Sequence, residues 1–152
     1  MTAFTEIIRG LEPEKFTEIF AASVRSSRET YFSRHGIKAP KKSSRILRAG
    51  AKNEMRTAAL FERLQSQDDD EMVEEMLRAY LMTKRPMLAV ALDFMGIDND
   101  DGLTESEDIS RFEKVKGGEL KKLIQALSEV APPEDIAVYL KFMGVPKVDS
   151  AL

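Results

Sequence analysis

The feature that most constrains this chain is an internal repeat of ten residues. The segment LAVALDFMGI at Leu88–Ile97 recurs as IAVYLKFMGV at Ile136–Val145, forty-eight positions later, with six identical residues. In both copies an apolar run with helical spacing leads directly into a glycine. The repeat therefore predicts the same helix, with the same stop, in two places.

Each repeated helix is predicted to end in a Schellman motif. Gly96 and Gly144 follow the apolar runs where the chain must enter the left-handed region, which glycine does without steric cost. The next residue should then fold back against an apolar side chain near the end of the helix. A third copy of this stop surrounds Gly36. The predicted contact pairs are Ile97 with Leu92, Val145 with Leu140 and Ile37 with Phe32.

A less similar helix precedes each repeated one, so the duplicated unit is a helical hairpin. The two hairpins are predicted at residues 71–97 and 119–145. Pro86 and Pro133 open the second helix of each hairpin, where a missing N–H group costs no hydrogen bond. A hairpin of this kind exposes an apolar face and buries it by packing against a neighbour. We therefore expect the two hairpins to dock.

Apolar spacing and capping residues predict the other helices. These helices are expected over 2–10, from Pro13 to about His35, from Ser43 or Ser44 to Gln67, from Asp68 into the first hairpin, and from Thr104 to a stop at Gly117 and Gly118. Residues 147–152 are expected to fray. The side chains expected to face inward include Val24, Met55, Ala58, Ala59, Leu64, Met72, Val73, Met76, Leu77, Tyr80, Leu81, Ile109, Phe112 and Val115.

These patterns together predict an all-α fold, a compact helical bundle of about seven helices that contains the duplicated hairpin. The length of 152 residues suits a single domain over 1–152, whose N-terminal part, 1–67, is basic. No stretch resembles a signal peptide or a membrane span. The expected location is therefore the cytoplasm of a prokaryote, with no membrane partner.

The residue types narrow the chemistry that the chain can perform. Cysteine is absent, which removes thiolate nucleophiles, disulfides and thiolate metal sites. His35 is the only histidine, and it precedes Gly36 at a predicted helix end, where a cationic side chain complements the helix dipole. No glycine-rich phosphate-binding loop is present. We therefore predict a protein that is not an enzyme, with no catalytic residue, no cofactor and no metal.

An acidic loop, IDNDDGLTESED at 97–108, departs from the EF-hand pattern. With Gly102 at loop position six, position one falls on Ile97, which has no ligand atom, and position twelve is an aspartate instead of a bidentate glutamate. An exposed turn with good helix-start chemistry is the favoured interpretation. An irregular cation site built from Asp98, Asp100 and Asp101 stays open as an alternative.

Charge is distributed unevenly along the chain. Residues 1–56 hold 12 Lys or Arg and 6 Asp or Glu, a net +6, whereas residues 57–152 carry a net −9. A basic segment at 34–56 could contact phosphate groups of a nucleic acid. A solvated basic face is the favoured interpretation, and the segment could also pair with the acidic half of the same chain or of a second copy. The candidate nucleic-acid-binding residues are Lys38, Lys41, Lys42, Arg45, Arg48 and Lys52.

The sequence favours a non-enzymatic helical interaction or scaffold module, whose partner is another protein or a second copy of the chain. The missing catalytic residues and the stacked hairpins support this hypothesis. The alternative is a nucleic-acid-associated regulator that uses the basic segment 34–56. A third hypothesis places a small-ligand pocket between the two hairpins.

Overall fold

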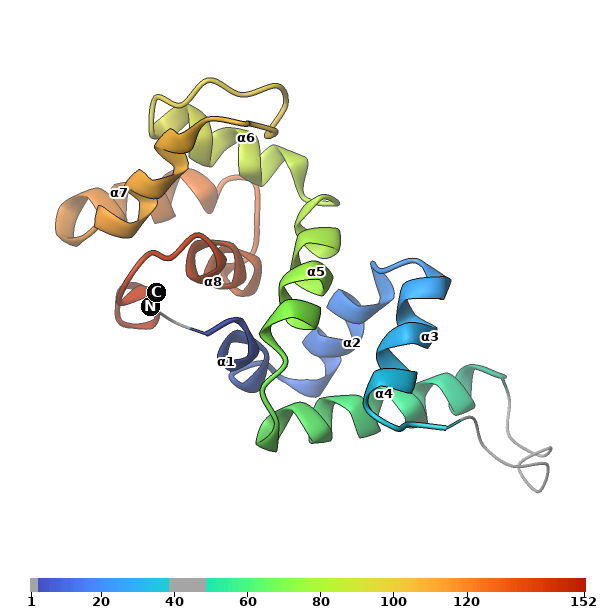
Figure 1. Cartoon of the computed structure of the whole chain (residues 1–152). Helices are drawn as coiled ribbons and strands as arrows, with labels where there is room; N and C mark the ends of the chain where they lie inside the picture. The colour runs from blue at the N-terminus through green and yellow to red at the C-terminus, as the bar shows by residue number, and fades with distance from the viewer. Residues whose placement is uncertain (1–2, 39–48) are drawn as a thin grey trace. The chain divides into compact units, whose positions relative to one another are not determined.

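A computed structural model describes residues 3–38 and 49–152, and within these ranges the side chains of all residues except 49–52. Over the described residues the chain is helical, with nine α-helices, one 3₁₀-helix and no strand (Figure 1). This confirms the predicted all-α fold class. The elements are α1 Phe4–Arg9, α2 Pro13–Ala21, α3 Arg25–Arg34, α4 Ala49–Ser66, α5 Asp70–Leu81, α6 Arg85–Phe94, η2 Glu107–Lys114, α7 Gly117–Leu127, α8 Pro133–Phe142 and α9 Val148–Ala151.

The helices group into two compact units. The first unit is Ala3–Tyr80 and contains α1 to α5, while the second contains Leu81–Leu152 and therefore α6, η2 and α7 to α9. The predicted hairpin at 119–145 lies entirely within the second unit. The predicted hairpin at 71–97 is divided, because α5 belongs to the first unit and α6 to the second. The docking of two equivalent hairpins therefore stays a prediction.

In the first unit, α4 packs against both α1 and α2, and α5 contributes the apolar stripe that its spacing predicts. Aromatic rings fill the space between α2 and α3, with the centres of Phe20 and Phe32 only 5.1 Å apart. The buried apolar residues of this unit are Ile7, Ile8, Phe16, Ile19, Phe20, Tyr31, Phe32, Leu60, Leu64, Met72, Val73, Met76, Leu77 and Tyr80. These residues form the apolar core of the first unit.

The long helix predicted from Pro13 to His35 is wrong, because the structure divides it into α2 and α3. Val24 has an extended backbone, with φ −66° and ψ 156°, and its side chain is 66% exposed, whereas the sequence places it inward. The break falls at residues 22–24, between the end of α2 at Ala21 and the start of α3 at Arg25. The break lets α3 fold back so that Phe32 meets Phe20.

The buried face of α4 also differs from the prediction. Leu64 is buried as expected, but Met55, Ala58 and Ala59 are exposed. The buried positions are instead Thr57, Leu60 and Leu64. Two leucines bury more apolar surface than the small alanines can, so they determine which side of the helix faces the core.

In the second unit, α6 packs on α7 and α9 packs on α8. The bounds of α6 and α8 coincide when the sequence is shifted by the repeat, from Arg85 to Pro133 and from Phe94 to Phe142. The buried apolar residues are Leu81, Met87, Leu88, Ala91, Leu92, Ile97, Phe112, Val115, Leu120, Leu123, Leu127, Ile136, Val138, Tyr139, Leu140, Val145 and Val148. The repeat thus produces two helices of equal length in one unit.

The three predicted Schellman stops are confirmed. Gly36, Gly96 and Gly144 have φ values of +68°, +69° and +86°. The N–H of each residue after the glycine donates to the carbonyl of the predicted partner, and each glycine N–H donates to the carbonyl of the residue after that partner. The first set of bonds joins Ile37 to Phe32 at 2.8 Å, Ile97 to Leu92 at 2.9 Å and Val145 to Leu140 at 3.0 Å.

Three other predictions for this unit are wrong. The segment expected to be an α-helix from Thr104 is the 3₁₀-helix η2, capped by Ser106, whose hydroxyl accepts from the Asp108 N–H. The Thr104 hydroxyl instead accepts from the Ser106 N–H and donates to the Asp98 carbonyl, so it stabilises the preceding loop and leaves Ile109 exposed. Gly117 does not end η2 but begins α7. The segment expected to fray forms α9, anchored by the buried Val148.

Candidate functional site

A cleft of about 480 Å³ lies between α2, α3 and α4 in the unit Ala3–Tyr80. This volume is within the range of known ligand and peptide pockets. None of its lining residues belongs to the predicted hairpins, so the cleft is not the pocket that the sequence suggests between them. The lining residues are Thr17, Phe20, Ala21, Arg25, Arg28, Glu29, Phe32, Asn53, Glu54 and Thr57.

The break between α2 and α3 creates the floor of the cleft. Because the chain turns after Ala21, Phe20 and Phe32 pack against each other from consecutive helices and are nearly fully buried. Arg56 of α4 covers the Phe32 ring, with its guanidinium carbon 4.1 Å from the ring centre. The floor is therefore apolar and held by all three helices.

Glu29 in the rim of the cleft forms an ion pair with Arg56 of α4. Arg56 donates two hydrogen bonds to the Glu29 carboxylate, at 3.1 and 2.9 Å. The side-chain hydrogen bond from Arg56, and secondarily its charge and those of Arg25 and Arg28, hold the pKa of Glu29 below its ordinary value. The opposite charges of Glu29 and Arg56 therefore neutralise each other at neutral pH.

Two other arginines on the rim are largely uncommitted. Arg25 is exposed and makes no hydrogen bond or ion pair with any of the described residues. Arg28 makes one long hydrogen bond, of 3.4 Å, to the Ala21 carbonyl. Glu54 is the one remaining carboxylate among the described lining residues. The rim therefore presents two guanidinium groups against one carboxylate, which favours an anionic ligand group.

The polar groups that line this cleft can bind a ligand. The two lining hydroxyls, of Thr17 and Thr57, donate to the backbone carbonyls of Pro13 and Asn53 and belong to the local helical structure. The described lining contains no histidine or cysteine that could act as a base or nucleophile. Guanidinium groups beside an apolar floor can hold a carboxylate that is attached to an apolar group.

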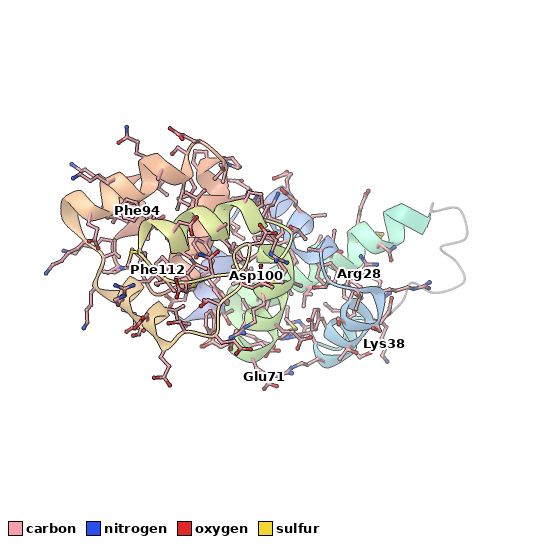
Figure 2. The ribbon with its side chains drawn as sticks, turned by 90° about the horizontal axis from the view of Figure 1, so that it is seen from above. Arg28, Lys38, Glu71, Phe94, Asp100 and Phe112 are labelled. Carbon is pink, nitrogen blue, oxygen red and sulfur yellow. The ribbon has the colours of Figure 1, made fainter. Side chains whose placement is uncertain are left out.

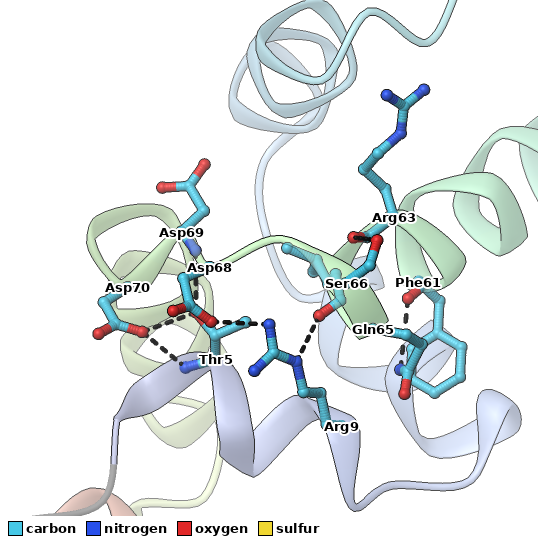
Figure 3. Close-up of polar contacts among 10 residues, drawn as sticks. Thr5, Arg9, Phe61, Arg63, Gln65, Ser66, Asp68, Asp69 and Asp70 are labelled. Carbon is cyan, nitrogen blue, oxygen red and sulfur yellow. Dashed lines mark hydrogen bonds and ion pairs between the residues drawn. The ribbon is translucent and has the colours of Figure 1, made fainter.

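A second polar cluster connects α1 to the start of α5 (Figure 3). The Thr5 hydroxyl and backbone N–H donate to one Asp70 oxygen, at 2.6 and 2.9 Å. These bonds, that of the hydroxyl first, hold the pKa of Asp70 below its ordinary value. Arg9 ion-pairs with Asp68 at 2.7 Å. This cluster joins the two helices to each other through side-chain contacts.

His35 contacts the same aspartate run. Its Nε2 atom lies 2.8 Å from Asp69 Oδ2, and both side chains are almost fully buried. The other Asp69 oxygen accepts from the Met72 N–H in the first turn of α5, and Arg34 also ion-pairs with Asp69 at 2.8 Å. The imidazole therefore lies at the predicted helix end and joins α3 to α5, a contact that the sequence analysis did not predict.

Two buried ionisable groups outside the cleft, Tyr31 and Asp135, have charged or polar partners in the protein. Tyr31 donates to Glu75, and burial together with this bond raises the pKa of Tyr31 to about 12. Asp135 is 1% exposed at the position that matches Met87 in the repeat, and Lys84 lies 3.7 Å from it. Burial also raises the pKa of Tyr139. These groups stabilise the fold, and none of them lines the cleft.

The predicted nucleic-acid-binding residues are not brought together by the described structure. Lys38 follows α3 and is exposed (Figure 2). Lys52 lies in α4, but its side chain is outside the described residues, as are Lys41, Lys42, Arg45 and Arg48. The predicted cap at Ser43 or Ser44 also lies outside them. The nucleic-acid interface therefore stays a prediction.

The acidic loop is held by its own hydrogen bonds and by one arginine. The Asn99 side chain accepts from the Gly102 N–H, and Arg85 donates to the Asp101 carbonyl at 2.6 Å (Asp100 in Figure 2 marks the loop). Gly102 has a φ of +90° and lies against α6, where an added Cβ would meet the Leu88 side chain at 2.8 Å. Across the described ranges no three His, Cys, Asp or Glu side chains converge on a metal position. The loop geometry therefore lends no support to a cation site.

Comparison of the chain with protein-family models, with curated proteins and with solved structures finds no match. Among the described helices none has the length and apolar character needed to cross a membrane. The function must therefore be argued from the cleft and from the charges around it.

Proposed function

We propose that this protein is a non-enzymatic interaction module that binds a segment of another polypeptide in the cleft between α2, α3 and α4. The observation that carries the proposal is the uncommitted Arg25 beside Arg28 on the rim of a cleft of about 480 Å³. Uncommitted guanidinium groups over an apolar floor are typical of polypeptide recognition, in which arginine is enriched.

The burial of the floor favours a polypeptide over a nucleic acid. Phe20 and Phe32 are 4% and 2% exposed, so their ring faces are covered and cannot stack on bases. Ala21 at the end of α2 is exposed and lines the same cleft, which leaves room for an aliphatic or aromatic side chain of a partner. The cleft therefore suits an apolar side chain of a polypeptide partner.

Selection from a displayed library of random peptides on the immobilised full chain tests the proposal. We expect enrichment of peptides that share an apolar residue beside acidic residues. Ala21→Trp places a large ring in the cleft and should abolish capture of these peptides. Ala59→Trp makes the same change at an exposed position of α4 outside the cleft, and should leave capture unchanged.

Circular dichroism of both tryptophan variants shows whether the helices persist. Failure to enrich any peptide family would contradict the proposal. Equal capture by the wild-type chain and a folded Ala21→Trp variant would also contradict it, because the peptides would then bind outside the cleft.

A further inference from the structure

We infer that the occupant of the cleft is the acidic loop of a second copy of this chain. The inference rests on the proposed function, since it names the partner of the same cleft. It follows from two features on different units, the positive rim between α3 and α4 and the acidic, apolar-tipped segment after α6.

The cleft supplies the positive side of the contact. Arg56 already neutralises Glu29, which leaves Arg25 and Arg28 against the single carboxylate of Glu54. Guanidinium groups bind carboxylates through two parallel hydrogen bonds, and Arg25 makes no hydrogen bond or ion pair with the described residues. An occupant with several carboxylates is therefore complementary to this rim.

The segment 98–109, which comprises most of the acidic loop and continues to the third residue of η2, supplies the negative side. It carries six carboxylates and no lysine or arginine. Arg85 pairs with Asp101 at 3.5 Å, and the other five carboxylates are exposed and make no ion pair with the described residues. The five are Asp98, Asp100, Glu105, Glu107 and Asp108. The loop therefore holds a surplus of negative charge that nothing described in its own chain neutralises.

The same loop also supplies apolar side chains for the cleft. Leu103 and Ile109 are 39% and 40% exposed, and both lie among the free carboxylates. The Asp100 and Leu103 backbones are joined by two hydrogen bonds, of 2.7 and 3.0 Å, so the loop presents Leu103 on a tight turn. A rigid turn loses little conformational entropy on binding, which favours association.

The central experiment is sedimentation velocity of the full-length chain from low to high micromolar concentration. We expect reversible self-association that weakens as salt rises, because the contact is made by exposed charges. Arg25→Glu/Arg28→Glu reverses the rim and should weaken association by about tenfold or more. Lys121→Glu/Lys122→Glu makes the same charge change on exposed positions of α7 and should leave association unchanged.

Charge reversal on the loop provides the complementary test. Asp98→Lys/Asp100→Lys/Glu105→Lys/Glu107→Lys changes the net charge of residues 98–109 from −6 to +2. It should also abolish self-association, because a basic loop then faces a basic rim. Mixing this variant with Arg25→Glu/Arg28→Glu should restore a complex, since each mutated surface then meets one of opposite charge. The variant Glu62→Lys/Glu119→Lys/Glu129→Lys/Glu134→Lys makes the same charge change at exposed positions outside the loop and serves as the control.

A wild-type chain that stays monomeric at high micromolar concentration and low salt overturns the inference, as does a mixture that fails to associate. A monomeric chain that shifts a DNA duplex at low salt overturns it in favour of nucleic-acid binding. If the chain is monomeric but still captures peptides that Ala21→Trp loses, the proposed function stands and only the identity of the partner is wrong. If the chain is monomeric and also captures no peptides, the proposed function and the inferred partner are both wrong.

Discussion

At the scale of single residues, glycines that end helices are the positions where sequence and structure agree best. Gly144 has φ +86°, and Val145 after it donates to the Leu140 carbonyl and is buried. The motif is local, because glycine, the apolar residue after it and the helix end are all within six positions. A local motif can be recognised without knowing what the rest of the chain does.

The left-handed conformation of Gly144 predicts the cost of replacing it. Gly144→Val should lower the free energy of unfolding by about 2 kcal/mol, because an L side chain in this region clashes with its own backbone. The added Cβ would also lie 3.1 Å from Glu113 Cγ, a flexible side chain that can move. Urea denaturation measures the difference.

Gly118 provides the matched control for this substitution. It lies in the first turn of α7 without a positive φ, and an added Cβ there meets no atom within 4 Å. Gly118→Ala should therefore stabilise the protein by about 0.5 kcal/mol, because the unfolded chain loses freedom. An unchanged midpoint for Gly144→Val would show that the stop does not depend on glycine.

At the scale of helices, the sequence predicts which segments are helical better than where they break or which face they bury. The segment from Pro13 to His35 has continuous apolar spacing, yet it breaks at Val24 because the tertiary contact between Phe20 and Phe32 requires α3 to fold back. Arg25 and Arg28 are recognisable as polar positions in the sequence. The cleft was not predictable, because it exists only through that break.

Contacts between distant segments likewise cannot be predicted from the spacing of apolar residues. Thr5 and Asp70 are 65 positions apart, and no spacing rule connects them. Their hydrogen bonds nonetheless join α1 to the start of α5 and lower the pKa of Asp70. The carboxylate is therefore more stable in its charged form in the folded protein than in the unfolded chain.

This shift predicts how the stability of the α1 and α5 contact depends on pH. Since the pKa of Asp70 is lowered from 3.8, its stabilising contribution is fully present above that value and is lost as the pH falls through the folded-state pKa. Asp70→Asn should lower the free energy of unfolding by about 1 kcal/mol at neutral pH. The difference from wild type should shrink as the pH falls below 3.8.

Urea denaturation at several pH values checks this prediction. Glu129→Gln removes an exposed carboxylate outside the Thr5 contact and should change stability little at any pH. A constant difference between Asp70→Asn and wild type across the acid range would contradict the role assigned to the charged form.

At the scale of the whole molecule, the predicted hairpins and the two compact units divide the chain at different places. The repeat predicts that residues 71–97 form one hairpin, whereas the contacts place α5 with the helices that precede it and assign Leu81 to the second unit. Similar hairpin sequences can pack differently, because Met87 in one copy corresponds to the buried Asp135 in the other. Sequence similarity between the copies therefore predicts their helices and caps but not their neighbours.

The connection between α5 and α6 predicts cooperative unfolding of the whole chain. Domain boundaries usually fall in exposed, flexible linkers, but α5 ends at Leu81, which is buried, and α6 begins at Arg85. Leu123 of α7 is fully buried, so Leu123→Ala should lower the free energy of unfolding by about 3 kcal/mol. If the whole chain unfolds as one domain, the free energy of unfolding of the first unit falls by the same amount.

Hydrogen exchange of the backbone amides in α4 and α7 measures where the loss occurs. We expect Leu123→Ala to reduce the protection of the most stable amides in both helices by the same free energy, because global unfolding limits their exchange in a cooperative domain. Leu60→Ala, which removes an equally buried leucine from α4, should produce the same pattern. The opposite result would be a loss of protection confined to the helix that carries the mutation, α7 for Leu123→Ala and α4 for Leu60→Ala. It would mean that the two compact units unfold as separate domains.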